Sequence, residues 1–118
     1  MSATLADFLA AGTAYAQASQ ATVAAQATVT AGTATVAQRK SDADRALQLV
    51  ETAANASPFV LATYQARLKE YGTASRKLNQ AQAQLDTATT TLTNAQAQQA
   101  FTLKNLQSVA DALASDPA

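Results

Sequence analysis

The sequence contains no cysteine, histidine or tryptophan, and only three glycines and two prolines. Without cysteine there is neither a disulfide nor a thiol nucleophile, and without histidine the commonest general base is missing. Three isolated glycines cannot form a phosphate-binding loop. Asp42 and Asp44 are two residues apart, do not share a helix face, and make a poor metal pair. The sequence therefore predicts a protein that is not an enzyme and that binds no cofactor and no metal.

An excess of either charge is also missing, because eight Lys and Arg residues balance eight Asp and Glu residues. A neutral chain has no general electrostatic attraction to nucleic acid or to an anionic membrane, so we expect neither as a partner. No run of about 18 strongly apolar residues exists, so no transmembrane segment is expected. Residues 1–7 lack the basic and Leu-rich regions of a signal peptide.

Large apolar residues are scarce. Hydrophobic residues make up 48% of the chain, but 32 of them are alanines and only 25 are larger. Alanine buries little area, so its benefit comes from letting backbones approach closely. This composition favours a thin seam between two helices, extended by self-association, over a thick globular core.

The large side chains that are present recur every seven residues, in two series that we call the ladders. The first ladder is Phe8, Tyr15, Thr22, Val29, Val36, Ala43 and Val50, and the second is Tyr64, Tyr71, Leu78, Leu85, Leu92, Gln99, Leu106 and Leu113. A heptad sustained this long predicts helices that wind around each other. If the chain folds back near Pro58, Val50 faces Tyr64 and Val29 faces Leu85. Mostly small residues occupy the positions three residues after each ladder position.

We therefore predict an all-α fold, a long antiparallel helical hairpin of the coiled-coil type within a single domain, 1–118, assembled into an oligomeric helix bundle. Helix 1 is expected at about 3–55, with Ser2 or Thr4 as its cap. Helix 2 is expected at about 58–115, with Ser57 as its N-cap and Pro58 at the first helical position.

Some segments could interrupt these helices, and breaks are considered near 39–41 and 72. The β-branched segments 28–36 and 87–93 partly resemble strands. The heptad passes through both without a change of phase, which favours helix. The turn is expected near Asn55–Pro58.

Charges are distributed unevenly. None occurs from Phe8 to Gln38 or from Thr87 to Leu103, and eleven of the sixteen fall between Arg39 and Lys77. A solvated two-helix stem normally carries Glu and Lys on its outer face. The uncharged Ala/Thr/Gln surface therefore favours burial against other copies or another protein, with a hydrated neutral surface as the alternative. The hairpin register also predicts ion pairs of Asp44 with Lys69 and of Arg45 with Glu70.

Three groups of residues are candidates for contacts. Packing and interface positions are Val29, Val36, Val50, Tyr64, Tyr71, Leu78, Leu85, Leu92 and Leu106. The apolar turn face, Phe59, Val60 and Leu61, is a candidate for closing the hairpin or contacting a partner. The basic band, Arg39, Lys40, Arg76 and Lys77, would either dock an acidic partner or be simply solvated.

The functional hypothesis is a structural or assembly protein, either a small helical building block or an attachment or decoration protein. Its expected partners are itself, as a homo-oligomer, and other structural proteins. A bacteriophage virion is the specific assembly considered, because small, weakly charged, Ala/Thr/Gln-rich helical proteins are associated with virion accessory parts. The expected location is accordingly a virion or the cytoplasm.

Two alternative functions belong to other classes of protein. One is a secreted or chaperoned helical partner protein that acts as a heterodimer. The hairpin is similar in shape to the small type VII secretion substrates, although Asn55-Ala56-Ser57-Pro58 replaces their Trp-x-Gly turn and the chain is not assigned to them. The other is an ice-binding helix bundle, because Thr22 and Thr33 are eleven residues apart, a spacing that does not persist along the chain.

Overall fold

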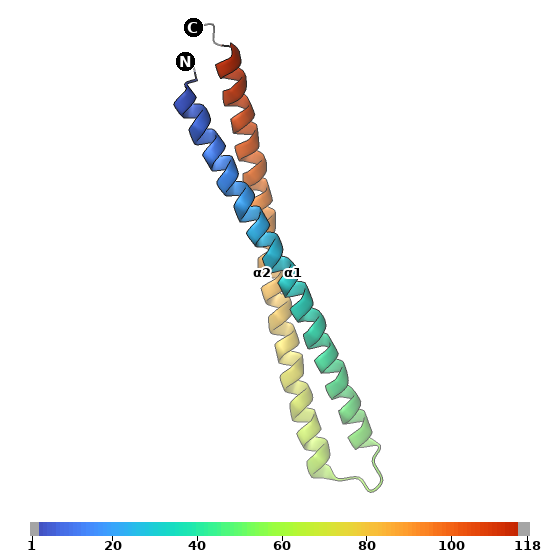
Figure 1. The fold of residues 1–118 in the computed structure, drawn as a ribbon. Helices are drawn as coiled ribbons and strands as arrows, with labels where there is room; N and C mark the ends of the chain where they lie inside the picture. Colours follow the sequence, from blue (N-terminus) through green and yellow to red (C-terminus); the bar gives the residue numbers. More distant parts are fainter. Residues whose placement is uncertain (1–2, 116–118) are drawn as a thin grey trace. The chain divides into compact units, whose positions relative to one another are not determined.

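Two antiparallel helices make up the protein. The computed structural model describes residues 3–115, of which about 93% are helical and none form a strand. Helix α1 spans Leu5–Ala54, helix α2 spans Leu61–Ser115, and a short loop joins them (Figure 1). Alanine, glutamine and leucine, which dominate both segments, are strong helix formers. The prediction of an all-α antiparallel hairpin is confirmed.

A reciprocal pair of hydrogen bonds begins α1. The backbone N–H of Thr4 donates to Oδ2 of Asp7 at 3.0 Å, and the N–H of Asp7 donates to Oγ1 of Thr4 at 3.1 Å. This is a capping box, which satisfies backbone donors that the first turn leaves without helical partners. Of the two predicted caps, Thr4 fills the role, and Ser2 lies outside the described residues.

The start of α2 differs from the prediction. The helix begins at Leu61, so Pro58 lies in the loop, joined to Ser57 by a cis peptide bond, and Ser57 is not the N-cap. The carbonyl of Val60 accepts the first helical hydrogen bond, from Tyr64 N at 3.1 Å. The rings of Phe59 and Tyr64 pack with centroids 5.7 Å apart. Phe59 precedes the cap and Tyr64 is the fourth helical residue, so a hydrophobic staple fixes this helix start.

Neither helix breaks where interruptions were considered. Residues 39–41 lie inside α1 and Gly72 lies inside α2. The β-branched segments 28–36 and 87–93 are also helical. Within these segments the hydroxyls of Thr28, Thr35, Thr87 and Thr93 donate to the carbonyl oxygen four residues earlier, at 3.0–3.2 Å, so the helix accommodates them. The same hydrogen bond forms elsewhere in the helices at Thr13, Thr22, Thr52, Thr73 and Thr102.

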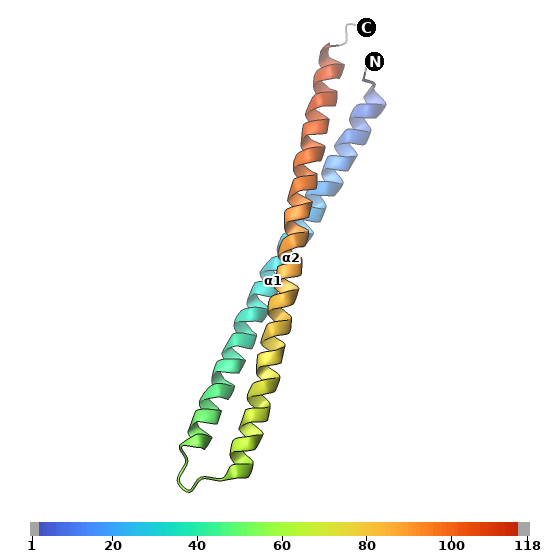
Figure 2. The same ribbon diagram turned by 180° about the vertical axis from the view of Figure 1, so that it is seen from behind.

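The chain forms two compact units. Unit 1 comprises Met1–Val29 with Ala88–Ala118, and unit 2 comprises Thr30–Thr87. In unit 1 the beginning of α1 and the end of α2 lie side by side in both views (Figures 1 and 2), and Nε2 of Gln99 donates to Oγ of Ser19 at 3.2 Å. Unit 2 contains the loop and the helical segments on either side of it.

Small residues line the seam in both units. The buried residues are Ala11, Ala18, Ala25, Ala88 and Thr102 in unit 1, and Ala43, Ala46, Val50, Ala53 and Ala81 in unit 2. Most ladder residues are only half-buried, and no large side chain among residues 3–115 is completely buried. The core is therefore a narrow strip of methyl groups with larger side chains at its edges.

The helices of unit 2 approach closely at Gly32. A Cβ atom added there would lie 3.2 Å from Cδ1 and 3.8 Å from Cα of Leu85. The ladders predicted that Leu85 faces Val29. In the structure Leu85 lies against Gly32, which is the small residue three positions after Val29. A large residue of one helix over a small residue of the other permits this short separation, as the small-residue stripe predicts.

Candidate interaction surfaces

All nine predicted packing residues are at least partly buried. Val50 is buried, and Val29, Val36, Tyr64, Tyr71, Leu78, Leu85, Leu92 and Leu106 are half-buried. A half-buried leucine or valine contributes to the contact between the helices and still leaves apolar surface at the edge of the seam. The seam alone therefore does not remove these side chains from water.

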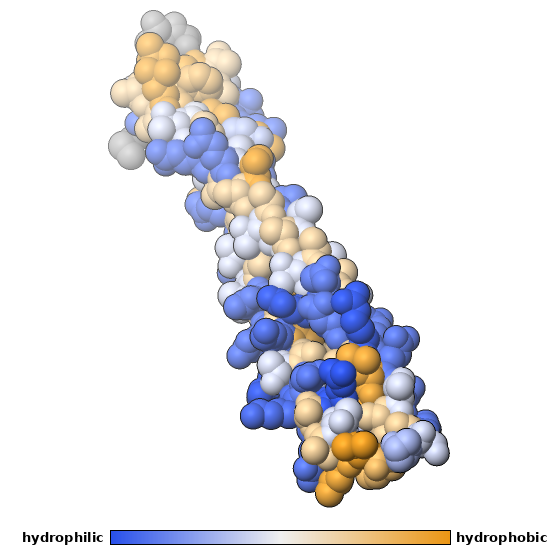
Figure 3. Space-filling model, turned by 60° about the horizontal axis from the view of Figure 1, so that its bottom comes forward, coloured by the Kyte–Doolittle hydropathy of each residue, from blue (hydrophilic) through white to orange (hydrophobic). Residues whose placement is uncertain are grey.

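The turn face is apolar and open. Phe59, Val60 and Leu61 are all exposed, and Leu68, two turns into α2, is 41% exposed. Orange apolar side chains gather at the loop end beside a blue hydrophilic zone (Figure 3). Because the ring of Phe59 also packs on Tyr64, its position is fixed by a contact inside the unit.

The basic band is only partly neutralised. Arg39 forms an ion pair with Asp42 at 3.7 Å, and Nη2 of Arg76 donates to Oγ1 of Thr73 at 3.3 Å. Within residues 3–115, Lys40 and Lys77 are exposed and form no ion pair.

The ion pairs predicted between the helices are absent from the described residues. Glu70 pairs with Arg67, one turn earlier in α2, at 3.1 Å instead of with Arg45. Asp44 forms no ion pair with Lys69. The predicted register places these residues at the same level, but Asp44 and Lys69 occupy heptad positions on the outer side of their helices. For Glu70, a cation one turn away on its own helix is then closer than a cation on the other helix.

A groove crosses the flank of unit 2. It has a volume of about 460 Å³, and its lining comes from both helices: Arg39 and Asp42 of α1, and Ala66, Lys69, Glu70, Thr73, Ala74 and Lys77 of α2. Of these lining residues, only Arg39 and Lys77 were proposed from the sequence as contact candidates; Lys69 and Glu70 were named as ion-pair partners, and the groove was not foreseen. The lining residues lie beside the ladders, where a seven-residue period alone does not show which neighbours meet.

The surface of unit 1 has a different character. Its described residues, 3–29 and 88–115, include only three charged side chains, Asp7, Lys104 and Asp111. Large apolar side chains project from the same unit, with Leu5 63%, Val23 71% and Phe101 65% exposed, and with Leu9 and Leu103 also exposed. The sequence interpretation missed these five residues because none belongs to a ladder. Large apolar residues off the ladder in a nearly uncharged stretch are the signal that could have identified them.

Within 3–115 no group of three or more acidic, His or Cys side chains is placed to hold a metal ion. In the same range, neither helix has a segment that is both long and apolar enough to cross a membrane.

No protein-family model matches the chain, and no curated protein or solved structure resembles it significantly.

Proposed function

We propose that the protein is a non-enzymatic assembly protein that associates with copies of itself through unit 1. In this role it serves as a building block or as an attachment or decoration protein of a larger particle. A bacteriophage virion is the specific particle we propose, on the basis of the weakly charged Ala/Thr/Gln-rich composition. One observation carries the proposal: unit 1 exposes large apolar side chains on a nearly uncharged surface.

The exposed residues of unit 1 are larger than those that its own seam buries. The seam buries alanines and one threonine, whereas Leu5, Leu9 and Phe101 remain in solvent. Burying a leucine or phenylalanine side chain completely is worth about 1.5–3 kcal/mol. Association that covers these side chains therefore supplies apolar burial that two helices alone do not provide.

The total exposed area agrees with this interpretation. The chain exposes 8140 Å² of surface for a mass of 12.1 kDa. A compact monomer of this mass exposes about 6,000 Å². The difference of about 2,000 Å² exceeds the roughly 800 Å² that each partner contributes to a specific protein interface.

Several threonines on the surface of unit 1 can be dehydrated at little cost in hydrogen bonds. Burying a hydroxyl is unfavourable when its hydrogen bonds to water are not replaced. Thr13, Thr28 and Thr93 already donate to carbonyl oxygens of their own helices. A neighbouring copy that covers these threonines therefore leaves no hydroxyl proton without an acceptor.

Native mass spectrometry of the purified protein, with sedimentation velocity at several concentrations, tests the proposal. We expect a defined homo-oligomer that dissociates on dilution. A monomer at all concentrations would contradict self-association. An obligate 1:1 complex with a different chain would instead support the alternative of a heterodimeric helical partner.

A further inference from the structure

The groove of unit 2 supplies a second binding surface, which the proposed self-association does not use. We propose that it binds an amphipathic peptide segment of another protein, whose acidic side chains contact Lys69 and Lys77 and whose apolar side chains contact the alanine floor. The juxtaposition of these lysines with Ala66 and Ala74 in one groove carries the inference.

The charge around the groove favours an acidic ligand. Residues 39–42 and 66–77 carry six cationic and two anionic side chains, a net charge of +4. The two anions already have cationic neighbours, because Asp42 pairs with Arg39 and Glu70 with Arg67. Within the described residues, Lys69 and Lys77 form no ion pair. Both ammonium groups are therefore available to a ligand carboxylate.

The floor of the groove is apolar. Ala66 and Ala74 contribute methyl groups, and the lysine stems add methylene groups beside them. Thr73 adds little hydrogen-bonding capacity, since its hydroxyl donates to Lys69 O at 3.2 Å and accepts from Arg76. A ligand that carried only charge would leave this floor uncovered, so the ligand must also have apolar side chains.

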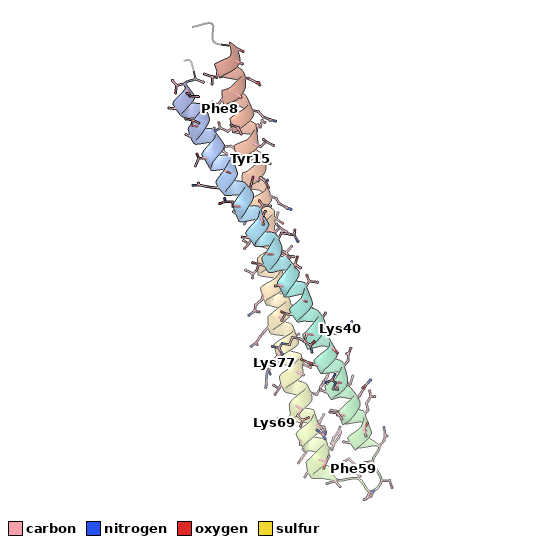
Figure 4. The ribbon with its side chains drawn as sticks, viewed as in Figure 1. Phe8, Tyr15, Lys40, Phe59, Lys69 and Lys77 are labelled. Atoms are coloured by element: carbon pink, nitrogen blue, oxygen red, sulfur yellow. The ribbon has the colours of Figure 1, made fainter. Side chains whose placement is uncertain are left out.

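The dimensions suit a peptide. A volume of about 460 Å³ is within the range of about 300–1,000 Å³ typical of ligand sites. Lys69 and Lys77 follow one another along α2 (Figure 4), and their spacing of eight residues corresponds to about 12 Å of helix. Two acidic residues seven apart on a ligand helix have nearly the same spacing, so a helix lying along the groove can reach both lysines.

The same residues disfavour nucleic acid. No aromatic side chain lines the groove, so no surface for base stacking is present. Asp42 and Glu70 stand among the cations, where they would repel a continuous row of phosphates. Carboxylates that are spaced apart along a peptide can contact the lysines without approaching Asp42 or Glu70.

Fluorescence anisotropy with the intact protein tests the proposal. The probe is a fluorescein-labelled, 15-residue helical peptide rich in Ala and Leu, with two Glu residues seven apart on one face. A matched peptide has Gln in place of both Glu residues. We expect the Glu peptide to bind at least ten times more tightly than the Gln peptide in 50 mM NaCl, and to weaken as salt is added.

Matched protein variants locate the site. Lys69→Gln with Lys77→Gln removes the two groove cations, whereas Arg45→Gln with Lys104→Gln removes two cations elsewhere and gives the same net charge. We expect at least a tenfold loss of affinity in the first variant and less than a twofold change in the second, with unchanged circular dichroism in both.

Other outcomes overturn the proposal. Equal losses in the two variants would mean that only the overall charge attracts the peptide. If the Gln peptide bound as tightly as the Glu peptide, the lysines would not recognise the ligand. If neither peptide bound at 100 μM protein, the groove would not be a peptide site. Tighter binding of labelled oligothymidylate than of the Glu peptide would assign the groove to nucleic acid. None of these results depends on the oligomeric state, so failure here leaves the association through unit 1 untouched.

Discussion

At the scale of single residues, the glycines of the two helices have different environments. An added Cβ at Gly12 or Gly72 would meet nothing within 4 Å. At Gly32 it would press on Leu85 at 3.2 Å. Glycine in a helix interior is about 1 kcal/mol less favourable than alanine. The helix therefore gains from a methyl group at each position, but at Gly32 the packing between helices opposes the gain.

We expect Gly72→Ala to raise the free energy of unfolding by about 0.5–1 kcal/mol, because it improves helix propensity without a clash. Gly32→Ala is the matched control and should gain less, since the side chain of Leu85 must move. Chemical denaturation followed by circular dichroism, at one protein concentration, measures both. If the two substitutions stabilise equally, the helices do not approach closely at Gly32.

At the scale of the elements, the two helix starts differ. The capping box of Thr4 and Asp7 satisfies the first backbone donors of α1. Helix α2 has Val60 at the cap position and no acidic residue in its first turn. Its start relies on the contact of Phe59 with Tyr64. An accepting side chain at Val60 would therefore add a favourable interaction that α2 lacks.

We expect Val60→Asp to be more stable than Val60→Ala by about 1 kcal/mol. Both substitutions remove the apolar contacts of valine, but only aspartate accepts a hydrogen bond from the first turn and carries a charge that the helix dipole favours. Thermal and urea denaturation of the pair gives the difference. Equal stabilities would show that the donors of the first turn are well satisfied without a side-chain cap.

At the scale of the whole molecule, the two units divide the chemistry of the surface. Unit 1 contains three charged residues among those described, whereas unit 2 contains seven cationic and five anionic ones. Exposed apolar side chains on a nearly neutral surface suit association between copies. Mixed charges around a groove suit recognition of a different partner. One chain can thus use its two units for different contacts.

We expect Phe101→Glu to convert the homo-oligomer to smaller species, because a charge would be buried without a partner. Phe101 is 65% exposed in the hairpin, so helicity should be preserved. Phe59→Glu makes the same chemical change in unit 2 and should leave the oligomer intact. Sedimentation velocity distinguishes them. Dissociation by the Phe59 variant but not by the Phe101 variant would place the contact at the turn instead of unit 1.

The main features of the fold were predictable because a seven-residue period records directly which helix face is buried. Val50, Leu78 and Leu85 therefore fall on the seam. The preference of Ser57 and Pro58 for helix starts placed the start of α2 too early. The helix begins at Leu61, where the ring of Phe59 packs on that of Tyr64, a contact that a residue-by-residue preference does not include.

The candidate surfaces were less predictable. The ion-pair prediction used only the level of two residues along the hairpin and left out the angle around each helix that their heptad positions give. Asp44 and Lys69 are level in the predicted register and still form no ion pair. Because the angle around the helix was not considered, the groove residues Ala66 and Thr73 were also not identified from the sequence. The exposure of Phe101 was overlooked in the same way, because its position two residues after Gln99 already places it off the ladder.

The hydrogen bond between Ser19 and Gln99, which are 80 positions apart, has a consequence for the order of folding. Contacts around the turn close short loops, whereas those of unit 1 join distant parts of the chain, and closing a longer loop carries a larger entropic cost. We therefore expect the contacts near the loop to form before those of unit 1. Under the proposed self-association, a second copy covers the apolar residues that unit 1 exposes, so we expect the closure of unit 1 to be linked to assembly.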